Sequence, residues 1–159
     1  MALARILRAA DAVVDELKAN ASEWSQSFEV ERFEPERDFV PEFLLNESEN
    51  CELQGLEKLR VVVIGRKRVR EGITRGEDQR DCSIEIGFLK RLNPSRKKEE
   101  TEELIRLVEE VENFFSDAHE VTGTEMRVVE ATTDPIFDPA ELRRGVFASL
   151  LVLTLREWL

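Results

Sequence analysis

Two stretches of the chain repeat apolar residues at the spacing of an α-helix. Between residues 3 and 18, and again between 100 and 117, apolar side chains such as Leu7 and Leu107 recur three and four positions apart, with charged residues between them. A helix has 3.6 residues per turn, so this spacing collects the apolar side chains on one side. Both stretches are therefore predicted to be amphipathic helices that bury one stripe each.

Other stretches have the composition of β-strands. Residues 59–64 are apolar and rich in valine throughout, which is typical of a strand covered on both faces. Residues 82–88 alternate apolar and polar side chains, as in a half-buried strand. The apolar run of 146–156 has no clean period and fits a helix as well, but its β-branched residues favour a strand. Shorter strands are predicted around 28–30 and 126–131.

The order of these elements predicts an α+β fold in a single domain that spans residues 1–159. Consecutive strands most often pair antiparallel, and two amphipathic helices each need an apolar surface to cover. The simplest packing is an antiparallel sheet of about five strands, with both helices on one face and a long charged hairpin arm. Residues 35–57 contain prolines and many acidic side chains, and are predicted to be a long excursion from the sheet.

The charge of the chain limits the classes of partner. The 23 Lys and Arg residues face 34 Asp and Glu residues, giving a net charge of -11, so the surface as a whole is not expected to bind nucleic acid. No apolar run is long enough to span a bilayer, and acidic residues interrupt the first helix before a signal peptide could form. We expect a soluble intracellular protein. Cys51 and Cys82 match no zinc or disulfide pattern and are predicted to be free buried thiols.

No combination of residues predicts a catalytic centre. His119 is the only histidine and follows the second helix, where the helix dipole favours a cation. The glycines match no phosphate-binding motif. The carboxylates of the second helix are predicted to form a solvated face rather than an acid/base pair or a metal site. We therefore expect no enzyme activity and no cofactor or metal site. These carboxylates are Glu99, Glu100, Glu102, Glu103, Glu109, Glu110 and Glu112.

Residues 65–80, called the arm below, depart from the acidic character of the chain. Six basic residues against three acidic ones give the arm a net charge of +3. A solvated hairpin tip accounts for such a segment. Alternatively, the arm reaches an acidic partner, which is either the surface of a neighbouring copy or the phosphate backbone of DNA. The candidate residues are Arg66, Lys67, Arg68, Arg70, Arg75 and Arg80.

The predicted final strand is apolar on both sides, which suggests a second interface. Two helices can cover only one face of a sheet, so the other face is expected to be buried against another subunit. The interface candidates on this strand are Phe147, Leu151 and Leu153.

Several features together carry a resemblance to a known family. They are the amphipathic N-terminal helix, the valine-rich strand, the charged arm, the acidic second helix and the ending F-D-x-x-x-L-x-x-x-x-F-x-x-x-L-x-L-x-x-R, formed by Phe137, Asp138, Leu142, Phe147, Leu151, Leu153 and Arg156. In this order the elements resemble the tail-terminator or tail-completion proteins of long-tailed bacteriophages, which are head-tail neck proteins.

The resemblance implies a structural virion protein that forms a homo-oligomeric ring, commonly a hexamer. The ring would cap the tail tube and join tail to head. Its partners would be further copies of the chain, the tail-tube protein and a head-completion or connector protein, with non-specific DNA contact in the lumen and no membrane. The protein would be located in the virion tail or neck, and in the host cytoplasm during assembly. The alternatives are a small host-encoded interaction module of the same fold class, and a carboxylate- or metal-dependent hydrolase.

Overall fold

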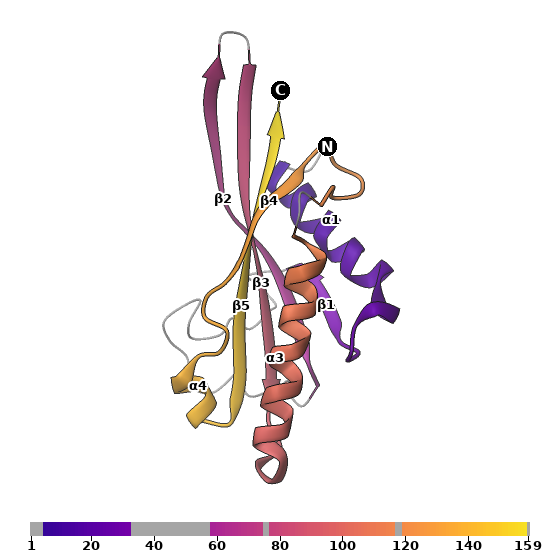
Figure 1. The fold of residues 1–159 in the computed structure, drawn as a ribbon, viewed down its shortest axis with the longest axis vertical. Coiled ribbons are helices and arrows are strands. Elements are labelled where there is room, and N and C mark those ends of the chain that lie inside the picture. Colours follow the sequence, from indigo (N-terminus) through magenta and orange to yellow (C-terminus); the bar gives the residue numbers. More distant parts are fainter. Residues whose placement is uncertain (1–4, 33–57, 75–76, 117–118, 159) are drawn as a thin grey trace.

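The computed structural model describes residues 5–32, 58–74, 77–116 and 119–158, with the backbone alone for 67–74, 77–80 and 158. The helices are α1 (Arg5–Ala19), α3 (Lys97–Phe114) and α4 (Pro139–Arg143), with 3-10 turns at Ala21–Glu23 and Pro94–Arg96. The strands are β1 (Glu29–Arg32), β2 (Arg60–Thr74), β3 (Glu77–Arg91), β4 (Arg127–Thr133) and β5 (Val146–Trp158). Figure 1 shows the β2–β3 hairpin rising past the rest of the fold. The predicted excursion at 35–57 and Cys51 lie outside the described residues.

The five strands form one mixed sheet in the order β1-β2-β3-β5-β4. The α+β class and the five strands confirm the prediction. All neighbours are antiparallel except β1, which runs parallel to β2 over four residue pairs. The expectation of a wholly antiparallel sheet is therefore wrong at β1. Parallel neighbours need a connection of about a dozen residues or more, and the chain from β1 to β2 is long enough to supply one.

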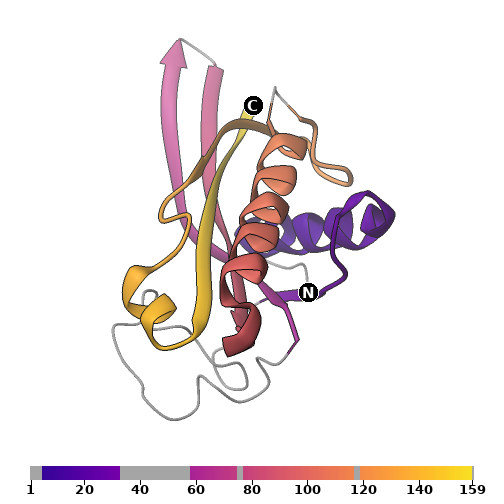
Figure 2. The same cartoon turned by 60° about the horizontal axis from the view of Figure 1, so that its bottom comes forward.

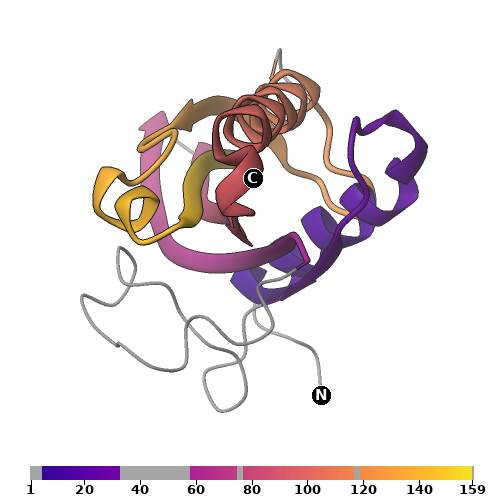
Figure 3. The ribbon, with the colours of Figure 1, turned by 90° about the horizontal axis from the view of Figure 1, so that it is seen from below.

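The helices α1 and α3 cover the same face of the sheet, as predicted (Figure 2). Leu17 of α1 and Leu107 of α3 belong to one buried cluster with Ile84 and Ile86 of β3. Seen from below, the sheet curves around α3 (Figure 3). Each fully buried leucine or isoleucine in this cluster stabilises the fold by about 1.5–3 kcal/mol. The core of the molecule therefore lies on this one face.

The end of helix α4 just before Val146 explains why residues 146–156 form a strand. Asp138 caps α4, since its Oδ1 accepts from the N–H groups of Ala140 and Glu141 at 2.9 and 3.3 Å. Pro139 occupies the first helical turn, as the sequence predicts. Gly145 then has a φ of 85°, a conformation that glycine adopts without strain and that ends the helix. The next residue, Val146, begins β5 and confirms the predicted strand.

Candidate functional site

The arm continues strands β2 and β3 and is not an irregular loop. Backbone pairing between the two strands runs through it as far as Thr74↔Glu77. Arg66 falls at a register shift, so a β-bulge marks the point where the arm leaves the body. Strand β5 accompanies β3 up to the pair Gln79↔Trp158. Beyond that pair the hairpin projects past the end of β5 (Figure 1).

Gly65 anchors the base of the arm against α1. A Cβ atom at this position would stand 2.6 Å from Cγ1 of Ile6 and 3.3 Å from the backbone oxygen of Ile6. Side-chain atoms do not approach this closely, so only glycine lets α1 lie across β2 here. The direction in which the arm leaves the body is thereby tied to the position of α1.

The structure brings several of the six basic candidates of the arm together. Arg66 is exposed, and its Nε donates to Oε2 of Glu85 at 3.2 Å. Arg70 and Arg80 stand directly opposite each other in the β2–β3 register. On its other side, Arg80 is paired in register with Glu157 of β5. Lys67 and Arg68 occupy paired backbone positions. Arg75 lies outside the described residues.

The three interface candidates on β5 face the interior of the chain. Phe147, Leu151 and Leu153 are fully buried in the core cluster beneath α1 and α3. Their assignment to a subunit interface is wrong, because the alternation of β5 turns these three side chains toward the helices. On the opposite face, Val146 and Ala148 are buried as well. The lower part of that face is therefore not an exposed apolar patch.

Close to the arm, the face of the sheet opposite the helices is polar. Arg156 of β5 forms a two-pronged ion pair with Asp81 of β3, with Nε–Oδ1 and Nη2–Oδ2 distances of 2.9 and 3.0 Å. The pair between Arg66 and Glu85 lies on the same face. Half-exposed pairs of this kind contribute about 0–1 kcal/mol each, and a two-pronged geometry fixes orientation. They hold β2, β3 and β5 together where the arm begins.

Besides the outer edge of the four-residue strand β1, two strand edges lack a partner among the described strands. On β2, strand β1 pairs only up to Val63, which leaves Ile64–Thr74 as the open edge of β2. On β4, the Val128 N–H donates to the carbonyl oxygen of His119, and Glu120 forms an isolated β-bridge with Arg127. The open edge of β4 is therefore Val129–Thr133. Val129 is 40% exposed and is the only large apolar side chain exposed in the described residues. Sequence periodicity does not reveal these edges, because it identifies strands and not their order.

His119 is bound to a carboxylate and is not a free base. Its Nε2 lies 2.7 Å from Oε2 of the buried Glu16 in α1, and the Thr122 N–H donates to Oε1 of the same side chain at 2.9 Å. The rings of Phe114 and Phe115 pack against the imidazole. Because α3 ends at Phe114, the expectation of a helix-end cation is wrong. His119 instead ties the segment after α3 to α1.

Glu100 is an exception to the solvated acidic face predicted for α3. It is buried and accepts from Lys90 Nζ at 2.7 Å and from the Asn93 N–H at 3.4 Å. Burial raises the pKa of Glu100, but the Lys90 hydrogen bond and charge, the Asn93 N–H and the charge of Arg96 outweigh this effect and lower the pKa. Its carboxylate is thus a structural partner of β3.

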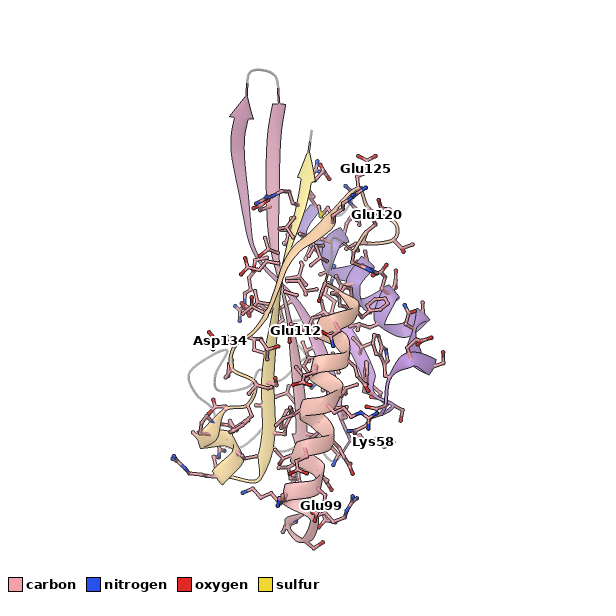
Figure 4. All side chains as sticks on the ribbon, viewed as in Figure 1. Lys58, Glu99, Glu112, Glu120, Glu125 and Asp134 are labelled. Atoms are coloured by element: carbon pink, nitrogen blue, oxygen red, sulfur yellow. The ribbon has the colours of Figure 1, made fainter. Side chains whose placement is uncertain are left out.

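Most other carboxylates are spread along the molecule. Figure 4 shows Glu99 at the lower end of α3, Glu112 near its upper end, and Glu120 and Glu125 near the top of the molecule. No group of three or more His, Cys, Asp or Glu side chains in the described residues has the arrangement of a metal site. None of the described helices has the length and apolar character needed to cross a bilayer.

A cleft of about 590 Å³ lies between the start of α1 and the segment before β4. Arg5 and Arg8 line it from α1, and Glu125 and Glu157 line it from the other elements. Arg5 donates to Glu157, so charges within the cleft neutralise each other. Among the described residues, the lining of the cleft contains no histidine, cysteine or serine.

No model of a known protein family matches this chain, and no curated protein matches its sequence. Function is therefore inferred from the arm, the two open edges and the resemblance described above.

Proposed function

We propose that this chain is the subunit of a homo-oligomeric ring that caps a phage tail tube and joins tail to head. The observation that carries the proposal is the arm. It is a paired hairpin with a sequence charge of +3 in a chain whose net charge is -11, and its basic positions from Arg66 to Arg70 and at Arg80 lie alongside the end of β5. The resemblance to tail-terminator proteins supports the same function, and implies the tail-tube protein and a head-completion or connector protein as neighbours.

Charge gives the reason for self-association. Copies of a strongly acidic chain repel one another, and a basic arm placed on the acidic surface of the next copy offsets this repulsion where the copies meet. The exposed side of α3 is such a surface. Its exposed carboxylates are Glu99, Glu102, Glu103 and Glu109.

A second placement of the arm keeps the ring and changes its ligand. If the arms point into the lumen, their cations meet the phosphates of the DNA that passes through. In this version, the arm contributes to DNA retention and not to assembly.

The test replaces Arg66, Lys67, Arg68 and Arg70 by serine and measures particle mass at low and high salt. The matched control replaces four exposed basic residues outside the arm by serine, so that the change in charge is the same. These control positions are Lys18, Lys98, Arg106 and Arg143.

A smaller particle for the arm variant only, at low salt, supports contact between subunits. An intact ring that loses DNA binding supports the lumen placement. A wild-type chain that is monomeric under all conditions rejects the ring and favours the interaction module. No described feature specifically favours the hydrolase.

A further inference from the structure

We infer that copies of this chain join through one continuous β-sheet, in which the open edge of β2 in one copy pairs with the open edge of β4 in the next. The inference rests on the proposed ring and names its contact. It pairs Ile64–Lys67, at the start of the open edge of β2, with the open edge of β4 at Glu130–Thr132.

The strand directions suit this contact. β2 and β5 run the same way, because each is antiparallel to β3, and β4 runs against them. In the upper half of Figure 1, β2 lies at the left edge of the sheet and β4 at the right. A copy that places its β4 beside the β2 of its neighbour therefore makes an antiparallel pair. Repeating this head-to-tail contact gives a closed ring when the rotation closes.

The two open edges also stand level with each other across the sheet. The residue pairs that connect β4 to β2 through β5 and β3 place β4 level, along the strand direction, with the start of the open edge of β2. The unpaired residues at the two ends of this span lie on the ladders Thr132↔Val152↔Glu85↔Ile64 and Glu130↔Thr154↔Ser83↔Lys67. Neighbouring copies can therefore pair without sliding along the strands. A slide repeated at each contact would give a helical filament instead of a ring.

The side chains on the two edges are complementary. Glu130 and Thr132 are exposed on β4, beside the exposed Val129. The ladder Glu130↔Thr154↔Ser83↔Lys67 places an acidic residue of β4 level with a basic residue of β2. An unpaired edge with an exposed apolar residue is a template for adding a strand. Pairing would satisfy the backbone groups of both edges, cover Val129 and bring opposite charges together.

The test is a cross-link between the two edges. In a Cys51→Ser background, Lys67→Cys and Glu130→Cys are combined and treated with a short thiol-reactive bifunctional reagent. The remaining Cys82 is fully buried. The expected result is a ladder of covalent dimers, trimers and larger species. The control combines Lys67→Cys with Glu23→Cys, which is exposed in the 3-10 turn after α1 and lies outside both proposed contact surfaces, and should give no ladder.

Exchanging the charges at positions 67 and 130 gives a second test, with variants that are expected to fold. Lys67→Glu or Glu130→Lys alone should reduce the fraction of chain in the ring, and the two together should restore it. A ring of normal mass without the 67–130 cross-link would overturn the edge pairing and leave the proposed function standing. A chain that neither cross-links nor exceeds the monomer mass would overturn both.

Discussion

The body of the molecule satisfies its apolar surface and its buried charges within one chain, whereas the arm and the two open edges do not. In the body, Leu107 is fully buried, and the buried carboxylates Glu16 and Glu100 each accept hydrogen bonds from named donors. At the edges, Val129 is exposed, and Ile64–Thr74 and Val129–Thr133 have no strand partner among the described residues. This difference between the body and the edges supports the proposal that the arm and the open edges contact another molecule.

The same substitution at an interior and an edge position should separate these two roles most strongly. Leu107→Asp should abolish cooperative folding, because truncating a buried leucine already costs about 2–5 kcal/mol and an unpaired buried charge adds to that. Val129→Asp should change stability by less than about 1 kcal/mol and reduce the ring mass. Thermal melts followed by circular dichroism measure the first effect. A cooperative Leu107→Asp transition near the wild-type Tm would show that the core is misplaced.

Two glycines test the junction between body and arm. Gly65→Ala should cost about 1–3 kcal/mol, because the new methyl group collides with Ile6 and α1 must shift. Gly87→Ala is the matched control, since the nearest atom to its Cβ would be 3.9 Å away. Adding Ile6→Ala to Gly65→Ala should recover part of the loss. Equal melting temperatures for the two alanine variants would contradict the contact between α1 and β2.

The Glu100–Lys90 pair predicts a pH dependence confined to the body. The pKa of Glu100 is lowered on folding, so its carboxylate adds stability above the unfolded value of about 4.3, and this contribution is lost as pH falls through the lower folded value. Glu100→Gln should therefore be less stable than wild type at pH 7, and the difference in unfolding free energy should shrink as the pH falls below the unfolded pKa of a glutamate. Denaturant unfolding at several pH values measures the difference, with the exposed Glu99→Gln as control. A constant difference across pH would contradict the prediction.

The smallest effect is expected at His119. His119→Gln keeps a hydrogen-bond donor for Glu16 and should change stability by less than about 1 kcal/mol, whereas His119→Ala should cost about 1–3 kcal/mol. Neither variant should alter the mass of the ring, because the contact lies within one chain. If His119→Gln lost assembly while its melting temperature stayed unchanged, His119 would have to lie in a subunit interface.

Sequence patterns predict where the helices and strands of this fold lie better than they predict which elements pair or pack together. The stripes of α1 and α3, the cap at Asp138 and the strand from Val146 follow from local periodicity and capping chemistry. The parallel pairing of β1, the burial of Phe147, Leu151 and Leu153 in the chain's own core, and the contact between His119 and Glu16 depend on how distant segments meet. The arm was visible as a local excess of positive charge. The open edges were not, because strand order is a property of the whole sheet.

The central claim is that the chain assembles into a closed ring through its arm and edges, and the mass of the wild-type particle in solution tests it most directly. Native mass spectrometry and light scattering across concentration should give one discrete oligomer at low salt. The oligomer should weaken as salt rises, because the Debye length falls from about 10 Å at 0.1 M to about 3 Å at 1 M and screens contacts between the arm and acidic surfaces. A chain that remains monomeric at every concentration and salt would contradict the account.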